Sequence, residues 1–184
     1  MRKLFNDELD RISTDEFKAA PKVRIVFVLD NLRSLNNIGS IFRTADAFRL
    51  EGICLCGISG IPPNKEIHKT ALGATESVQW QYFEQTEDCV DALRKEGYLI
   101  VALEQVANSV KLNHFNIDKN RAYAIILGNE VEGVKQEVVD VSDYCVEIPQ
   151  FGTKHSFNVV VSAGIVLWHF YLEGLRVDNP DPLV

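Results

Sequence analysis

The sequence predicts an α/β fold in which a mostly parallel β-sheet is flanked by helices. Short β-branched apolar runs alternate along the chain with segments whose apolar residues recur at helical spacing. The first run, VRIVFVLD at residues 23–30, is apolar at nearly every position, as is typical of strands covered on both faces of a parallel sheet. No linker, internal repeat or low-complexity segment divides the 184 residues, so we expect one main domain.

The composition is that of a globular protein, with 46% apolar and 24% charged residues. No apolar run is long enough to cross a bilayer, and the first residues lack the apolar stretch of a signal peptide. We therefore expect no membrane association. The cysteines show no metal-ligand spacing, so we expect no metal and buried free thiols, which are typical of a cytoplasmic location. These cysteines are Cys54, Cys56, Cys89 and Cys145.

The net charge of −7 lowers the expectation of a nucleic-acid partner, because phosphate binding usually leaves a basic footprint. Binding depends on a local patch, however, and net charge averages over the whole surface. The composition therefore does not exclude RNA.

The N-terminal part is expected to form a short extension at residues 1–20, separate from the main domain at residues 21–176. An amphipathic helix is predicted at residues 6–18, with Leu9, Ile12 and Phe17 on one side. Pro21 ends this helix before the strand at residues 23–30. We expect the extension to pack on the domain or on a partner subunit.

The next elements follow from periodicity and turn residues. A polar loop leads into a helix at residues 38–48, and a strand at 52–58 precedes a loop too rich in proline for regular structure. A helical turn around Lys69 is broken at Gly73. The helix at residues 86–96 has acidic residues in its first turn, where the helix dipole favours them. Further strands are expected at 78–83, 98–105, 122–128 and 145–149, a short extended piece at 111–115, a helix at 134–142 and a tail at 177–184.

A final long helix is predicted at residues 156–175, with Ser156 and Asn158 close to its start. A helix N-terminus carries unpaired N–H groups and a partial positive charge, which suits an anionic or carbonyl group of a ligand. Taken alone, the serine is more simply the N-cap of a core helix. The pattern alone would predict a doubly wound, Rossmann-like sheet, but the first strand is not followed by GxGxxG.

Three segments change this interpretation when they are considered together. They are LNNIGSIFRTADAF at residues 35–48, ILGNEVEGV at 126–134 and IPQFGTKHSFNVVVSAGIVLWHFY at 148–171. In this order they resemble the three motifs of the SpoU/TrmH family of RNA 2'-O-ribose methyltransferases, within the SPOUT superfamily. The likeness extends from about residue 23 to residue 171, nearly the whole chain.

The resemblance implies S-adenosylmethionine as the methyl donor and tRNA or rRNA as the substrate. It implies a C-terminal deep trefoil knot, the SPOUT α/β-knot, which no general rule of topology would have predicted. It also implies a homodimer with a shared active site. The final helix is apolar around much of its circumference, and burial against a second copy of the chain would account for this.

The first motif, NxGxxxR, is matched by Asn37, Gly39 and Arg43. On its own, Arg43 would be an ordinary exposed helix residue. The resemblance places Arg43 beside the ribose and phosphate of the target nucleotide. It also implies that Arg43 serves the cofactor that the partner chain binds. Because a guanidinium has a very high pKa, we prefer a role for Arg43 in clamping phosphate and stabilising developing alkoxide charge over one in proton removal. The sequence does not specify whether Arg43 or Glu130 takes the proton. Arg33 and Lys69 are the other expected RNA contacts.

The second motif, GxExxG, is matched by Gly128, Glu130 and Gly133, with Asn129 between the first two. We expect Glu130 to hold Arg43 or Asn37 by a charge-assisted hydrogen bond, or alternatively to accept the proton. The glycines at 39 and 128 are expected to allow close approach of the backbone, the second one to the cofactor.

The third motif is matched by Ser156 and Asn158, which we expect to position the ribose or the catalytic arginine. Phe157 stands where the family usually has leucine, a departure that could alter the adenine pocket. The full set of expected cofactor-binding residues is Leu103, Glu104, Gly128, Asn129, Ile148, Gln150, Ser156 and Phe157.

Two alternatives remain open. The chain could be a catalytically inactive RNA-binding module on the same fold, although the joint presence of Arg43, Glu130, Ser156 and Asn158 argues against this. It could instead be a nucleotide-binding α/β protein without an RNA role. The sequence does not specify which RNA or which nucleotide would be modified.

Overall fold

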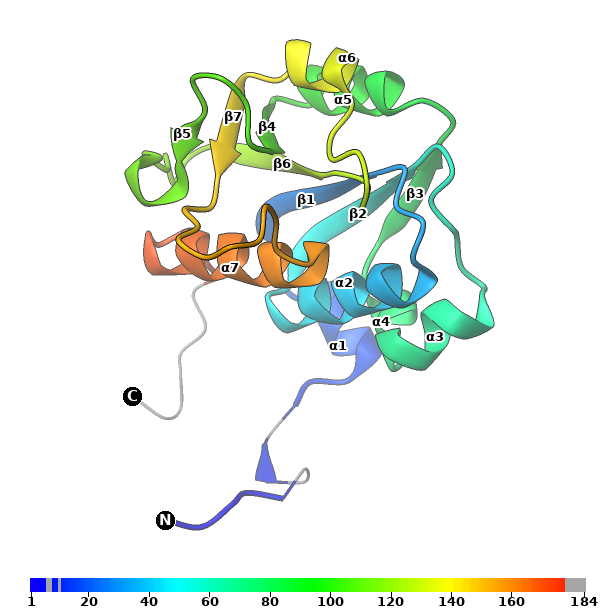
Figure 1. Ribbon diagram of the computed structural model, residues 1–184. Helices are drawn as coiled ribbons and strands as arrows, with labels where there is room; N and C mark the ends of the chain where they lie inside the picture. The colour runs from blue at the N-terminus through cyan, green and yellow to red at the C-terminus, as the bar shows by residue number, and fades with distance from the viewer. Residues whose placement is uncertain (6–7, 10, 178–184) are drawn as a thin grey trace.

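The computed structural model describes residues 1–5, 8–9 and 11–177. In this part of the chain a single seven-stranded sheet lies between two layers of helices (Figure 1). The strand order is β3-β2-β1-β6-β4-β7-β5, and all six pairings between neighbours are parallel. The predicted α/β fold with a parallel sheet is therefore confirmed.

The strands and helices alternate along the chain. The strands are β1 (Val23–Asp30), β2 (Leu50–Cys56), β3 (Trp80–Phe83), β4 (Tyr98–Leu103), β5 (Val110–Lys111), β6 (Ala122–Leu127) and β7 (Tyr144–Glu147). The helices are α1 (Thr14–Ala19), α2 (Leu35–Ala47), α3 (Lys65–Ala71), α4 (Ala74–Ser77), α5 (Thr86–Lys95), α6 (Gln136–Asp140) and α7 (Val159–Leu172), with a 3-10 turn, η2, at Leu112–His114.

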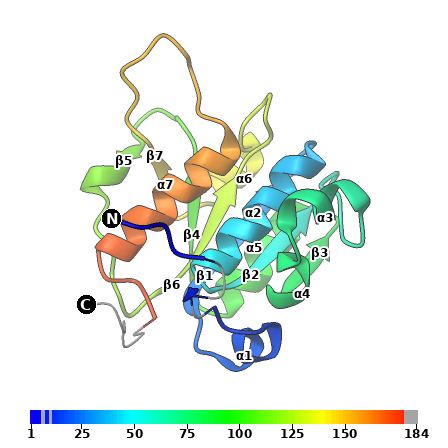
Figure 2. The same ribbon diagram turned by 90° about the horizontal axis from the view of Figure 1, so that it is seen from below.

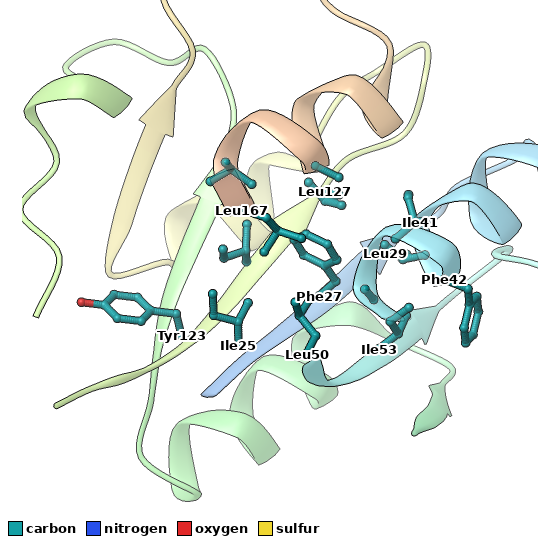
Figure 3. Packing of buried hydrophobic residues seen from close by; sticks show 14 of the residues in the cluster. Ile25, Phe27, Leu29, Ile41, Phe42, Leu50, Ile53, Tyr123, Leu127 and Leu167 are labelled. Atoms are coloured by element: carbon teal, nitrogen blue, oxygen red, sulfur yellow. The ribbon is translucent and has the colours of Figure 1, made fainter. Parts of the chain in front are cut away.

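One hydrophobic cluster lies between the sheet and the layer that contains α2 and α7 (Figures 2 and 3). Phe27 and Leu29 of β1 pack there with Ile41 of α2 and Leu167 of α7, all of them at most 2% exposed. Alternate residues of the same strands point to the other face, where α5 and α6 cover them. The two central strands are thus buried on both sides, as their near-continuous apolar runs predict.

The predicted cysteine environment is confirmed within the described residues. Cys54 and Cys56 point to the same face of β2 and pack with Cys89 of α5. These three thiols are buried, Cys145 is half-buried, and all four are free.

Among the described residues, the helix predicted at residues 6–18 is shorter than expected and covers only the last part of this range. Residues 6, 7 and 10 lie outside the described residues, and α1 begins only at Thr14. Ser13 and Glu16 form a capping box, in which the Glu16 carboxylate accepts the Ser13 N–H at 2.7 Å. Leu9 and Ile12 are exposed, so the apolar spacing that suggested a longer helix does not form a buried face.

The final helix begins three residues later than predicted. Asn158 is the N-cap of α7, and its Oδ1 accepts the Val160 N–H at 2.9 Å. Ser156 therefore belongs to the preceding connection, and residues 151–158 are all exposed. The extended piece predicted at 111–115 is mostly the turn η2, and most of the predicted tail, residues 178–184, lies outside the described part.

The strand order places a topological switch beside β1. The chain moves outward from β1 to β2 and β3, then continues on the other side of β1 with β4, β6 and β7. In parallel sheets, ligands bind outside the carboxyl ends of the strands at such a point. The connections that follow β1, β4, β6 and β7 all leave the sheet at the edge formed by the carboxyl ends of the strands.

Candidate active site

A cleft of about 530 Å³ lies outside the carboxyl ends of β4, β6 and β7. Its walls are formed by residues 103–105, 127–133 and 146–148, together with Gln150, 155–159 and Ser162. All eight residues predicted to bind the cofactor line this cleft: Leu103, Glu104, Gly128, Asn129, Ile148, Gln150, Ser156 and Phe157.

Glu130 joins the second motif to the first at the mouth of the cleft. Its Oε2 accepts the backbone N–H of Arg33, and its Oε1 accepts the backbone N–H of Ser34, each at 3.0 Å. The Oε1 also accepts the side-chain amide of Asn37 at 3.0 Å. Of the two partners expected for this carboxylate, the structure brings it to Asn37 and not to Arg43.

The electrostatics of Glu130 follow from these contacts. Partial burial raises the pKa of its carboxyl, but hydrogen bonds from Arg33, its own N–H, Asn37 and Ser34 outweigh this, and the pKa lies below its usual value. The group is ionised at neutral pH. A carboxylate whose pKa is lowered in this way is a weak proton acceptor, so its geometry suits holding neighbouring groups better than general-base catalysis.

Asn158 brings the third motif to the same place. Its Nδ2 lies 3.5 Å from the Oδ1 of Asn37, at the limit of a hydrogen bond. A chain of polar contacts thus runs from Asn158 through Asn37 to Glu130, over sequence separations of 121 and 93 residues. The three motif segments meet at one point of the fold.

Asn129 fixes the loop that follows β6. Its Nδ2 donates to the carbonyl of Asn31 at 2.7 Å, and its Oδ1 accepts the Val131 N–H at 2.8 Å. Its own backbone N–H and C=O pair with Gly133, both at 2.9 Å. These contacts turn the chain back and close one wall of the cleft.

Two further carboxylates hold the same loop, and the sequence did not indicate this role for either. Glu104 Oε2 accepts the Val134 N–H at 2.9 Å, and the fully buried Asp30 accepts the Lys135 N–H at 3.0 Å. Asp30 also accepts the Thr86 hydroxyl at 2.6 Å, which ties the end of β1 to α5. The only sequence feature that points to these two carboxylates is an acidic residue at, or directly after, the end of a mostly apolar strand.

The glycines at 39 and 128 permit close packing within the fold. A Cβ at Gly128 would lie 2.2 Å from the backbone of Gly133 and Val134, so the loop itself requires glycine there. A Cβ at Gly39 would lie 2.2 Å from the Ile67 carbonyl and from Thr70 Oγ1. The close approach at Gly39 is therefore between α2 and α3.

The predicted RNA-contacting residues lie outside the cleft. Arg33 precedes α2, Arg43 lies on α2 and Lys69 lies on α3, and all three are exposed. Within residues 1–5, 8–9 and 11–177, no hydrogen bond or ion pair involves the Arg43 guanidinium. Arg43 is thus available to a ligand or partner that approaches from outside.

The interior of the cleft is acidic. Four glutamates and no lysine or arginine are among its lining residues, and one of the four, Glu147, is ion-paired with Lys111 just outside the lining. Such a lining favours a ligand that carries positive charge and disfavours one with several phosphates. The glutamates are Glu104, Glu130, Glu132 and Glu147.

Two further features are absent from the described ranges. No group of three or more histidine, cysteine, aspartate or glutamate residues there could hold a metal ion. None of the helices described is both long and apolar enough to span a membrane.

These features define an α/β protein with a cleft outside the carboxyl ends of the strands of a parallel sheet. The model of the SpoU rRNA Methylase family matches residues 24–168, and the chain belongs to this family. The family predicted from the three motifs is thereby confirmed.

Similar proteins support the assignment. A protein of Staphylococcus saprophyticus assigned to the TrmH family of tRNA/rRNA methyltransferases is 27% identical over 154 residues, which cover 84% of this chain and 61% of that protein. The AdoMet-bound rRNA methyltransferase of Sinorhizobium meliloti has a TM-score of 0.73 at 28% identity, covering 81% of this chain and 59% of the other.

The A. aeolicus TrmH/SpoU tRNA modifying enzyme shares the fold, with a TM-score of 0.75 at 23% identity, covering 91% of this chain and 86% of that one. This chain spans roughly 60% of the length of the first curated relatives that it matches.

Proposed function

We propose that this protein is an S-adenosylmethionine-dependent RNA methyltransferase that transfers a methyl group to a ribose 2'-hydroxyl of tRNA or rRNA. The observation that carries the proposal is the chain of contacts Asn158–Asn37–Glu130 at the mouth of the cleft. Membership of the SpoU family and the likeness to an AdoMet-bound rRNA methyltransferase support it.

The cleft suits S-adenosylmethionine in charge and in lining. When bound, this cofactor supplies a methyl group activated by a positively charged sulfur. The four carboxylates of the cleft favour that charge, and the apolar Leu103, Ile148 and Phe157 provide apolar surface beside polar main-chain groups. A nucleotide with several phosphates would meet the same carboxylates, of which Glu147 alone is paired with a lysine, and this argues against a protein that only binds such nucleotides.

The side chains at the mouth have separate roles. Ionised Glu130 fixes the start of α2 and orients Asn37, and Asn158 supports Asn37 from the other side. Arg43 clamps the phosphate beside the target ribose and stabilises the negative charge that develops on the 2'-oxygen. The exposed Arg33, just before α2, and Lys69, on α3, add phosphate contacts outside the acidic cleft.

A homodimer with a shared active site belongs to the same proposal. The outer face of α7 carries exposed apolar side chains, and Trp168 stacks on Tyr171 with ring centroids 5.3 Å apart. Covering this face with a second copy would remove apolar surface from water and place Arg43 of one protomer near the partner's cleft. The trefoil knot and the cytoplasmic location remain predictions; free, mostly buried thiols agree with the latter.

The test combines cofactor binding with methyl transfer. Titration calorimetry should show binding of S-adenosylmethionine but not of ATP or NAD. Tritium-labelled S-adenosylmethionine should label RNA from a strain that lacks the gene, and nucleoside mass spectrometry should identify a 2'-O-methyl nucleoside. RNA binding without transfer would instead support the inactive RNA-binding module, and a base-methylated product would exclude the ribose assignment.

A further inference from the structure

The connection between β7 and α7 carries an aromatic side chain that the fold does not use. This connection projects beyond the edge of the sheet (Figure 2). Phe151 lies within it and is 96% exposed, so its ring makes almost no contact with the rest of the chain. Because burial of apolar surface is what makes an aromatic residue favourable in folding, Phe151 contributes very little to stability in this structure.

The loop that carries Phe151 nevertheless borders the candidate active site. Gln150 on one side and His155 on the other both line the cleft. The carbonyl of His155 accepts the Gln105 side-chain amide at 2.7 Å, and Asn158 caps α7 three residues later. Both ends of the segment thus border the cleft, one of them held by a hydrogen bond, with the exposed ring between them.

The side of the loop next to the ring is open. A Cβ added at Gly152 would meet nothing within 4 Å, so the space beside this residue is not filled by other described residues. Lys154 and His155 follow in the same loop and are also exposed. The mouth of the cleft therefore combines an accessible aromatic ring with a cation.

This combination fits an unpaired stretch of RNA. Aromatic rings stack on bases whatever the sequence, and lysine contacts the neighbouring phosphates. The carboxylates that line the cleft disfavour phosphate inside it, whereas the exposed Lys154 lies in the loop next to the lining residue His155 and can contact phosphate there. A nucleobase is uncharged and can approach the rim without this penalty.

We propose that Phe151 stacks on an unpaired nucleobase of the RNA next to the modified nucleotide, while Lys154 contacts an adjacent phosphate. The proposal rests on the function proposed above and adds a substrate-binding residue to it. An unpaired base is specified because both faces of a base inside a duplex are already covered by its neighbours.

The test compares Phe151→Ala, Phe151→Trp and the control Phe5→Ala with the unaltered protein. Phe5 is another exposed phenylalanine, 70% exposed and outside the cleft. The substrate is the fraction of RNA from the deletion strain that accepts methyl groups from the unaltered protein. Phe151→Ala should raise the KM for this RNA by about 5- to 100-fold, as loss of one stacked base predicts, with a smaller change in kcat. Phe151→Trp should restore the KM, and Phe5→Ala should leave it unchanged.

Two controls separate this proposal from its alternatives. Calorimetry should show unchanged S-adenosylmethionine affinity in Phe151→Ala, and sedimentation should show an unchanged oligomeric state. An unchanged KM would overturn the proposal, and so would a shift to monomers, because the ring would then pack against a second protomer. Absence of methyl transfer by the unaltered protein is a different result, which would count against the proposed function.

Discussion

Glu130 is the residue on which the first and second motifs depend, because a single carboxylate orders the start of α2 and the side chain of Asn37. We expect Glu130→Gln to lower kcat/KM for methyl transfer by roughly 10- to 100-fold, through loss of charge-assisted hydrogen bonds. Steady-state kinetics measures this loss. An unchanged kcat/KM would remove Glu130 from the site.

The lowered pKa of Glu130 also predicts a pH dependence of stability. Because the folded-state pKa lies below the unfolded value of about 4.5, the carboxylate stabilises the fold fully above that pH, and this contribution is lost as pH falls through the folded-state pKa. Urea unfolding should therefore show the unaltered protein more stable than Glu130→Gln at pH 7, with the difference shrinking steadily below about pH 4.5. A difference that is constant with pH would contradict the assigned contacts.

Arg43 is expected to act on RNA and not on the cofactor, because it is exposed on α2 and does not line the cleft. Arg43→Ala should abolish methyl transfer and leave the affinity for S-adenosylmethionine unchanged in calorimetry. Arg43→Lys should restore little activity, since a lysine cannot reproduce the planar two-pronged contact with phosphate. Full activity of Arg43→Ala would remove the assignment.

At the scale of elements, the packing of α2 on α3 depends on Gly39. A methyl group there would lie 2.2 Å from the Ile67 carbonyl, so Gly39→Ala must push the two helices apart. We expect a loss of about 1 to 3 kcal/mol in the free energy of unfolding, the usual cost of overpacking. The neighbouring Ser40→Ala, in the same helix, should change stability by less than about 0.5 kcal/mol. Chemical denaturation would measure both, and equal effects would refute the steric explanation.

Strand β1 shows how far the sequence predicts an element. Its bounds, Val23–Asp30, agree with the prediction because an apolar run is delimited by a proline upstream and an acidic residue downstream. In contrast, β5 consists of Val110–Lys111 alone and exists through pairing with β7, an interaction that leaves no local pattern. The predicted start of α7 at Ser156 is wrong because Ser156 and Asn158 are both good N-caps, and the second is the one that caps the helix.

The sequence predicts the part of the candidate site in which side chains contact one another. The three motifs specified Asn37, Glu130 and Asn158 at positions that the structure brings together. The contacts of Asp30 and Glu104 could not be predicted in the same way. These carboxylates bind backbone N–H groups of Lys135 and Val134, and a main-chain partner leaves no residue type to recognise.

At the scale of the whole molecule, the exposed face of α7 predicts self-association. Trp168 and Leu172 are 53% and 59% exposed in the single chain. Analytical ultracentrifugation should show a dimer, and Trp168→Asp should convert it to monomers with loss of methyl transfer, because Arg43 would no longer reach a partner's cleft. Val141→Asp, at an exposed apolar residue of the opposite layer, should leave the dimer intact. A monomeric unaltered protein with full activity would contradict the shared site.

The position of β1 between β2 and β6 has a consequence for biosynthesis. One edge of β1 pairs with β2, whereas the other pairs with β6, which begins about 90 residues later in the chain. At translation rates of about 5 to 20 residues per second, that second edge stays unpaired on the ribosome for about 5 to 20 s. During this interval the nascent chain presents an apolar strand edge of the kind that aggregates or recruits chaperones.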